Sequence, residues 1–105
     1  MNVSTAMSRA AAAFDLRSSL QQMLTSGDQV LLEAGTIAKL AGETRSVFSH
    51  HHPAFAQLHA ARVDAMDARG AFDHGFDMSA DAATLRARGG IENAIASITD
   101  TIRGH

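Results

Sequence analysis

Apolar residues recur at helical spacing near both ends of the chain. Near the start, apolar positions three or four residues apart predict a helix from about Ser8 to Thr25. Near the end, four isoleucines spaced i, i+4, i+7, i+11 predict a last helix with one apolar stripe: Ile91, Ile95, Ile98 and Ile102. Residues 1–7 are mostly small and show no packing pattern, so we expect them to fray.

Glycine and proline divide the middle of the chain. A second helical segment starts at about Gln29, and we expect Gly35 and Gly42 to interrupt it, because a helical Gly costs up to about 1 kcal/mol relative to Ala. Pro53 suits the start of a third helix, which should end at about Arg69. Further breaks are predicted beyond it: a cap at Gly70, a loop over residues 71–77, a short helix from Ser79 to Arg88, and a stop at Gly89-Gly90.

The composition agrees with a helical protein. Alanine is abundant, and the 105 residues include one Pro and no Cys, Trp or Tyr. Alanine favours helix because it loses the least conformational entropy there. This length is enough for one modest core. The sequence therefore predicts an all-α fold: a small irregular bundle of four to six helices, with a helix-turn-helix-like corner, in one domain over residues 1–105.

The corner is predicted between Ile37 and Pro53. In a helix-turn-helix a small residue lies where the two helices cross, and Ala38 meets this need. Gly42 suits the turn, because glycine readily adopts the left-handed backbone that such a turn uses. Phe48 would pack the second helix onto the first, and the polar residues after Gly42 would face DNA.

This segment resembles the DNA-binding domain of the tetracycline-repressor family over roughly residues 8–60. Ile37-Ala38 is followed by Ala41-Gly42-Glu43-Thr44-Arg45, and His50-His51-His52-Pro53 ends the second helix. Ser49 and His52 replace the tyrosine and phenylalanine common in that family. The resemblance implies a dimeric transcriptional regulator that reads DNA with a set of polar side chains: Thr44, Arg45, Ser46, Ser49 and His50.

The charge balance favours a different class of function. The formal net charge is −2, whereas nucleic-acid binders usually gather Lys and Arg on one face. The alternative is a non-catalytic helical adaptor or assembly subunit that acts through protein-protein contacts. The isoleucine stripe of residues 91–102 would then be either part of the chain's own core or an oligomer interface between copies.

Other chemistry has little support in the sequence. His50, His51 and His52 are adjacent and point in different directions, so we expect no metal site there. The loop residues Asp73, His74 and Asp77 are expected to be solvated. No phosphate-binding loop or nucleophile motif occurs, so we expect no cofactor and no enzyme activity.

The expected surroundings are those of a soluble bacterial protein. The absence of cysteine fits a reducing compartment, and the alanine and arginine usage is typical of a GC-rich bacterial genome. No run of 18 apolar residues and no signal peptide are recognisable, so we expect a cytoplasmic protein without a membrane partner.

Overall fold

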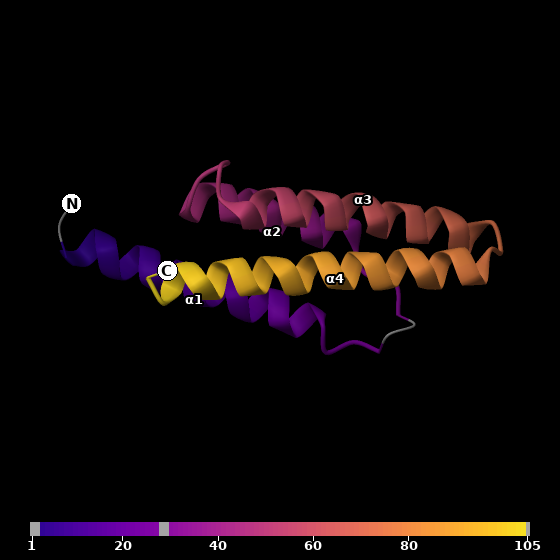
Figure 1. The fold of residues 1–105 in the computed structure, drawn as a ribbon, viewed down its shortest axis with the longest axis horizontal. Helices are drawn as coiled ribbons and strands as arrows, with labels where there is room; N and C mark the ends of the chain where they lie inside the picture. Colours follow the sequence, from indigo (N-terminus) through magenta and orange to yellow (C-terminus); the bar gives the residue numbers. More distant parts are fainter. Residues whose placement is uncertain (1–2, 28–29, 105) are drawn as a thin grey trace.

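The computed structural model describes residues 3–27 and 30–104, which form four helices and no strand. The helices are α1 (Val3–Met23), α2 (Ala34–Val47), α3 (Pro53–Asp73) and α4 (Asp77–Ile102). The predicted all-α class is confirmed, with the smallest helix number in the expected range (Figure 1).

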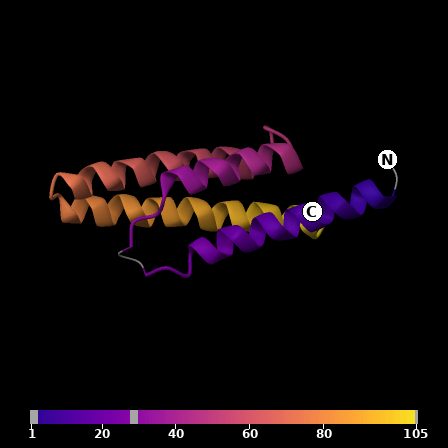
Figure 2. The same cartoon turned by 180° about the vertical axis from the view of Figure 1, so that it is seen from behind.

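Successive helices run in opposite directions. α1 packs against α2, α2 against α3, α3 against α4, and α4 returns to α1. Figures 1 and 2 show the same up-down-up-down order from two sides, with α3 and α4 side by side along their lengths. The molecule is elongated, with principal extents of 53 × 22 × 19 Å. This is the arrangement of an antiparallel four-helix bundle.

Small buried residues join α3 to α4. On α3 the buried positions alternate steps of four and three, and α4 follows the same spacing from Ala80 through Thr84 to Ile98, with Ala83 as an additional buried position. Near the α3–α4 turn these positions hold short side chains, which let the two helices approach closely. The buried residues are Ala54, Leu58, Ala61, Ala65 and Ala68 on α3, and Ala80, Ala83, Thr84, Ala87, Ile91, Ala94 and Ile98 on α4.

Larger side chains build the core in the other half of the bundle. Leu20 of α1, Ile37 of α2, Leu58 of α3, and Ile91 and Ile98 of α4 are all fully buried. α1 and α2 cover this half only, so the turn between α3 and α4 extends beyond them (Figures 1 and 2). The bundle therefore has a thick end and a thin, two-helix end.

The isoleucine stripe belongs to the chain's own core. Ile91 and Ile98 are fully buried by the other helices, and Ile95 and Ile102 are partly buried against the same cluster. Of the two interpretations offered by the sequence, the core is the one observed. In this fold neither Ile91 nor Ile98 has a side chain that is accessible to a second copy.

The break expected at Gly42 is absent. α2 runs from Ala34 to Val47 through both Gly35 and Gly42. The buried face of α2 continues past Gly42 to Thr44, and this packing outweighs the low helix propensity of glycine. The chain does turn a corner here, but at residues 48–52. The start expected at Gln29 lies outside the described residues; the helix itself begins at Ala34.

The expected breaks at Gly70 and Gly89-Gly90 are also wrong. α3 continues to Asp73, and one long α4 replaces the two short helices. Gly90 shows the reason, because a Cβ built on it would lie 3.0 Å from Cβ of Ala61 and 3.2 Å from the carbonyl oxygen of Gln57. The glycine lets the two helices pack closely, so it supports the helix pair instead of ending α4. α1 also begins earlier than predicted, at Val3.

Candidate interaction surfaces

The structure separates the five residues predicted to read DNA. Thr44 is fully buried, and its hydroxyl donates to the carbonyl oxygen of Leu40 at 2.9 Å. Arg45 and Ser46 are exposed on the last turn of α2, whereas Ser49 and His50 lie in the turn over residues 48–52. These residues do not share one helix, so the predicted recognition helix over residues 44–52 is not formed.

His52 fixes the corner between α2 and α3. Its Nδ1 accepts a hydrogen bond from the backbone N–H of Ala54 at 3.1 Å, which caps α3. Its Nε2 lies 2.7 Å from Oγ1 of Thr101, and that hydroxyl donates to the carbonyl of Ser97. Because the hydroxyl proton is already used, Nε2 must be the donor to Thr101, and the ring is neutral with its proton on Nε2.

Burial affects the charge of the same ring. The Phe48 ring stacks on His52, with 4.3 Å between ring centroids. Partial burial removes water from the imidazole and lowers the pKa of His52 from its ordinary value of 6.5. A protonated ring would also point an N–H at the N–H of Ala54. His52 is therefore a structural side chain that favours its neutral form.

The remaining histidines and carboxylates form no metal centre. Nδ1 of His74 lies 2.7 Å from the carbonyl oxygen of Gly70, and Asp73 pairs with Arg69 at 3.2 Å. Within residues 3–27 and 30–104, no group of three or more His, Cys, Asp or Glu side chains is placed to hold an ion. The loop predicted over residues 71–77 is shorter in the structure, because α3 ends at Asp73 and α4 begins at Asp77, which leaves a turn at residues 74–76.

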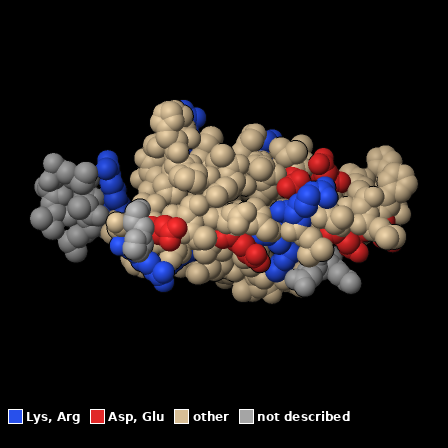
Figure 3. All heavy atoms as spheres, viewed as in Figure 1, with Lys and Arg blue, Asp and Glu red and all other residues tan. Residues whose placement is uncertain are grey.

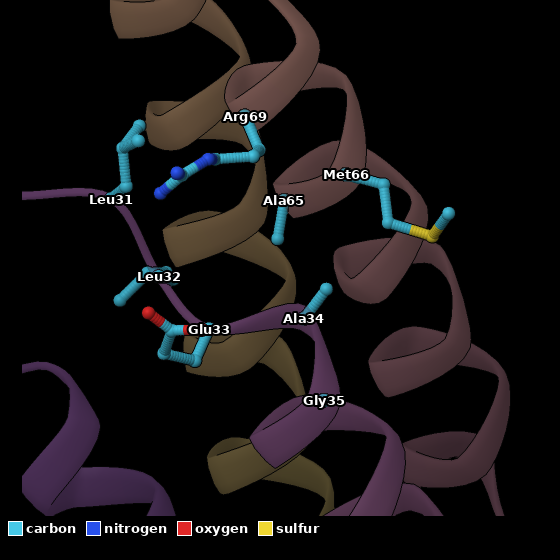
Figure 4. A pocket seen from close by; sticks show the side chains of 8 residues that line it. All are labelled: Leu31, Leu32, Glu33, Ala34, Gly35, Ala65, Met66 and Arg69. Atoms are coloured by element: carbon cyan, nitrogen blue, oxygen red, sulfur yellow. The ribbon is translucent and has the colours of Figure 1, made fainter. Parts of the chain in front are cut away.

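One shallow groove lies where the α1–α2 connection meets α3. It has a volume of about 480 Å³, and Figure 4 shows Arg69 extending across it toward Leu31. Glu33 is the other charged group on its wall, and the other lining residues are Leu31, Leu32, Ala34, Gly35, Ala65 and Met66. This lining resembles a surface between packed elements more than a catalytic pocket, which needs converging polar groups.

The two most exposed large apolar side chains of the described residues, those of Met78 and Phe76, lie at the α3–α4 turn, and Phe72 lies beside them. Phe72 is 53% exposed, Phe76 62% and Met78 87%. We call these three residues, with the adjacent Asp73, Asp77 and Asp81, the hairpin tip. Isolated exposed apolar residues are ordinary, whereas several large ones within one short segment are less common on the surface of a single chain.

The hairpin tip is acidic as well as apolar. Between Phe72 and Asp81 the sequence has three Asp residues and no Lys or Arg. Asp77 and Asp81 make no ion pair within the described part of the chain. Figure 3 shows this end of the molecule as a largely uncharged surface, with acidic side chains next to it and basic side chains beside those farther inward. A partner for this surface therefore needs apolar area together with positive charge.

An apolar notch lies at the opposite end of the bundle. α1, the end of α2 and the end of α4 enclose a space of about 430 Å³, which we call the notch. Phe14 is 46% exposed, and the guanidinium of Arg17 lies 4.9 Å from the centre of its ring. The lining residues are Arg9, Ala10, Ala13, Phe14, Val47, Phe48, Thr101 and Ile102.

Sequence patterns did not identify either surface. Phe72 and Phe76 fall in the loop predicted over residues 71–77, and Met78 directly follows it. The available signal was the pairing of two phenylalanines and a methionine with aspartates in a segment that lacks helical apolar spacing. The notch depends on elements far apart in the sequence, so no local pattern indicates it.

Comparison with known proteins adds no identification. No family of known proteins, no curated protein and no solved structure matches this chain. Among the described helices, none is both long and apolar enough to cross a membrane.

Proposed function

We propose that this protein is a non-catalytic helical assembly subunit that acts through protein-protein contacts at the hairpin tip. The observation that carries this proposal is the exposure of Phe72, Phe76 and Met78 on adjacent turns of a rigid helix pair. Large apolar side chains at such positions cost solubility, so their presence is best explained by a partner that covers them.

The structure gives DNA binding less support. The turn at Gly42 on which that prediction depended is not formed, and Thr44 faces the core. Arg45 and Ser46 are accessible, but the net charge is −2 and the hairpin tip would repel phosphate groups. DNA binding stays a prediction, which a polarisation titration at low salt can check.

Photo-crosslinking in the organism that encodes the protein tests the proposal. Met78 is replaced by p-benzoylphenylalanine, with Glu92 replaced in the same way as the matched control, because Glu92 is exposed on the same helix. We expect protein adducts from position 78 and few or none from position 92. If position 78 forms no more adducts than position 92, the hairpin tip is not a protein contact surface and the proposed function is wrong.

A further inference from the structure

We infer that the partner of the hairpin tip is the notch of a second copy of this chain, so that copies join head to tail. This inference rests on the proposed function and names the partner. Two features carry it: the two surfaces have matching apolar character, and their charges are opposite.

Both surfaces have exposed apolar side chains. Phe76 and Met78 are 62% and 87% exposed at the α3–α4 turn, which Figure 1 shows at the thin end of the bundle. The notch is concave, holds about 430 Å³ and has Phe14, Phe48 and Ile102 on its walls. An aromatic or thioether side chain entering this space would contact aromatic and aliphatic groups that are now partly open to water.

The charges favour a contact between a hairpin tip and a notch over a contact between two hairpin tips. Arg9 is the one charged residue that lines the notch in the described structure, and Arg17 lies beside it over Phe14. The nearby carboxylates of Asp15 and Glu43 line a separate groove between α1 and α2. Contact between a hairpin tip and a notch therefore brings aspartates close to arginines. Contact between two hairpin tips would bring carboxylates close together, and their repulsion would weaken binding.

The placement of the surfaces determines the form of the assembly. The hairpin tip and the notch lie at opposite ends of the long axis, as Figures 1 and 2 show for the elements that carry them. A contact between two different surfaces of the same chain is heterologous, so each added copy leaves one tip and one notch free. The expected product is an open row of copies, unless curvature closes it into a ring.

The decisive test uses two variants that each lose one surface. The tip variant is Phe76→Ser with Met78→Ser, and the notch variant is Arg9→Glu with Phe14→Ser. Val63→Ser is the matched control, because Val63 is 44% exposed and belongs to neither surface. Circular dichroism and melting first establish that all variants fold. Sedimentation velocity over a concentration series then gives the size of each species.

We expect the parent and the Val63→Ser control to grow beyond a dimer with concentration, while each surface variant alone stays monomeric. An equimolar mixture of the two variants should form one-to-one dimers and nothing larger, because only one intact tip and one intact notch can meet. The inference is overturned if the mixture stays monomeric, if either variant alone still associates, or if the parent stays monomeric at the highest concentration.

A charge exchange gives a second, independent test in the same chain. Asp77→Lys and Arg9→Glu should each weaken association by about tenfold or more, since like charges then meet. The chain with both changes should recover most of the lost association, because the new lysine meets the new glutamate of the next copy. Absence of recovery, with folding retained, would exclude the proposed pairing.

The two proposals fail in different ways. If position 78 cross-links in cells to a different protein and the copies do not associate in solution, the head-to-tail inference is wrong and the assembly-subunit function stands. If position 78 gives no adduct above its control, the function fails as well.

Discussion

At the scale of single residues, His52 shows how one side chain joins the start of α3 to the end of α4. Its ring caps α3 through Ala54 and reaches Thr101 near the end of α4. The cap needs Nδ1 without a proton, whereas Nε2–H can donate to Thr101 in either protonation state. Stability should therefore depend on the protonation state of this one imidazole.

The pKa of His52 predicts a loss of stability in mild acid. Because burial lowers the folded-state pKa below 6.5, the unfolded chain binds the proton more tightly. The contribution of His52 is fully present above pH 6.5 and is lost as the pH falls from there through the folded-state pKa. His52→Asn keeps an N-cap acceptor but does not titrate.

Urea unfolding of the parent and of His52→Asn between pH 8 and pH 5 checks this prediction. The difference in unfolding free energy between the two proteins should move in favour of the variant as the pH falls, with other titrating groups common to both. A difference that does not change with pH would mean that His52 has the same pKa in the folded and unfolded chain.

Thr44 shows what the sequence could and could not give at this scale. Ile37, Leu40, Ala41 and Thr44 follow the spacing i, i+3, i+4, i+7, and all four are buried on α2. That pattern was present in the sequence, but the break assumed at Gly42 placed Thr44 on another helix. The hydroxyl of the buried Thr44 donates its hydrogen bond to the Leu40 carbonyl one turn earlier in the same helix. The composition does not indicate such a local bond.

At the scale of elements, the helices were predictable and their ends were not. The apolar spacing gave the helical faces, including the isoleucine stripe that forms the core side of α4. Every internal glycine used as a stop was misleading, because contact with a neighbouring helix outweighs a propensity cost of about 1 kcal/mol. Such contacts are decided by tertiary packing, which single-sequence patterns do not contain.

Two adjacent glycines of α4 allow a matched prediction about this packing. Both are inside the helix, but a Cβ on Gly89 would meet nothing within 4 Å, whereas one on Gly90 would press on Ala61 and on the Gln57 carbonyl. Gly89→Ala should raise the free energy of unfolding by up to about 1 kcal/mol. Gly90→Ala should instead lower the free energy of unfolding by about 1–3 kcal/mol relative to the parent, because the added methyl group overpacks the contact between α3 and α4.

Equilibrium unfolding in urea measures both substitutions under the same conditions. The helix-propensity gain is common to the two variants, so their difference reports the close contact at Gly90. Equal stabilisation by both would show that α3 and α4 are farther apart at this point than the structure places them.

At the scale of the whole molecule, the two ends of the bundle differ because only one is covered. Large side chains fill the core where four helices meet, and alanines fill the contact between α3 and α4 in the half that the helices α1 and α2 do not cover. The sequence shows which face of each helix is apolar, but not how far α1 and α2 extend along the other pair. That length decides which apolar residues are core and which are exposed at the hairpin tip. The sequence shows phenylalanines beside aspartates in this segment, but not that their side chains stay uncovered.

The difference between the buried and the exposed part of α4 predicts opposite effects on stability when an apolar residue is replaced by Asp. Ile98 is fully buried and Met78 is 87% exposed, and both belong to α4. Ile98→Asp loses roughly 1.5–3 kcal/mol of apolar burial and also places a carboxylate in the core. For a domain whose total stability is about 5–15 kcal/mol, we expect this variant to be largely unfolded.

Met78→Asp should keep the fold and its melting temperature close to those of the parent, because the side chain is in water in the single chain. Circular dichroism with thermal melting separates the two variants, and sedimentation reports their mass. If Ile98→Asp retained both the melting temperature and the mass of the parent, Ile98 would be exposed and the described core would be wrong. A large loss of melting temperature in dilute Met78→Asp would show that the hairpin tip is packed within its own chain, and would remove the surface on which assembly depends.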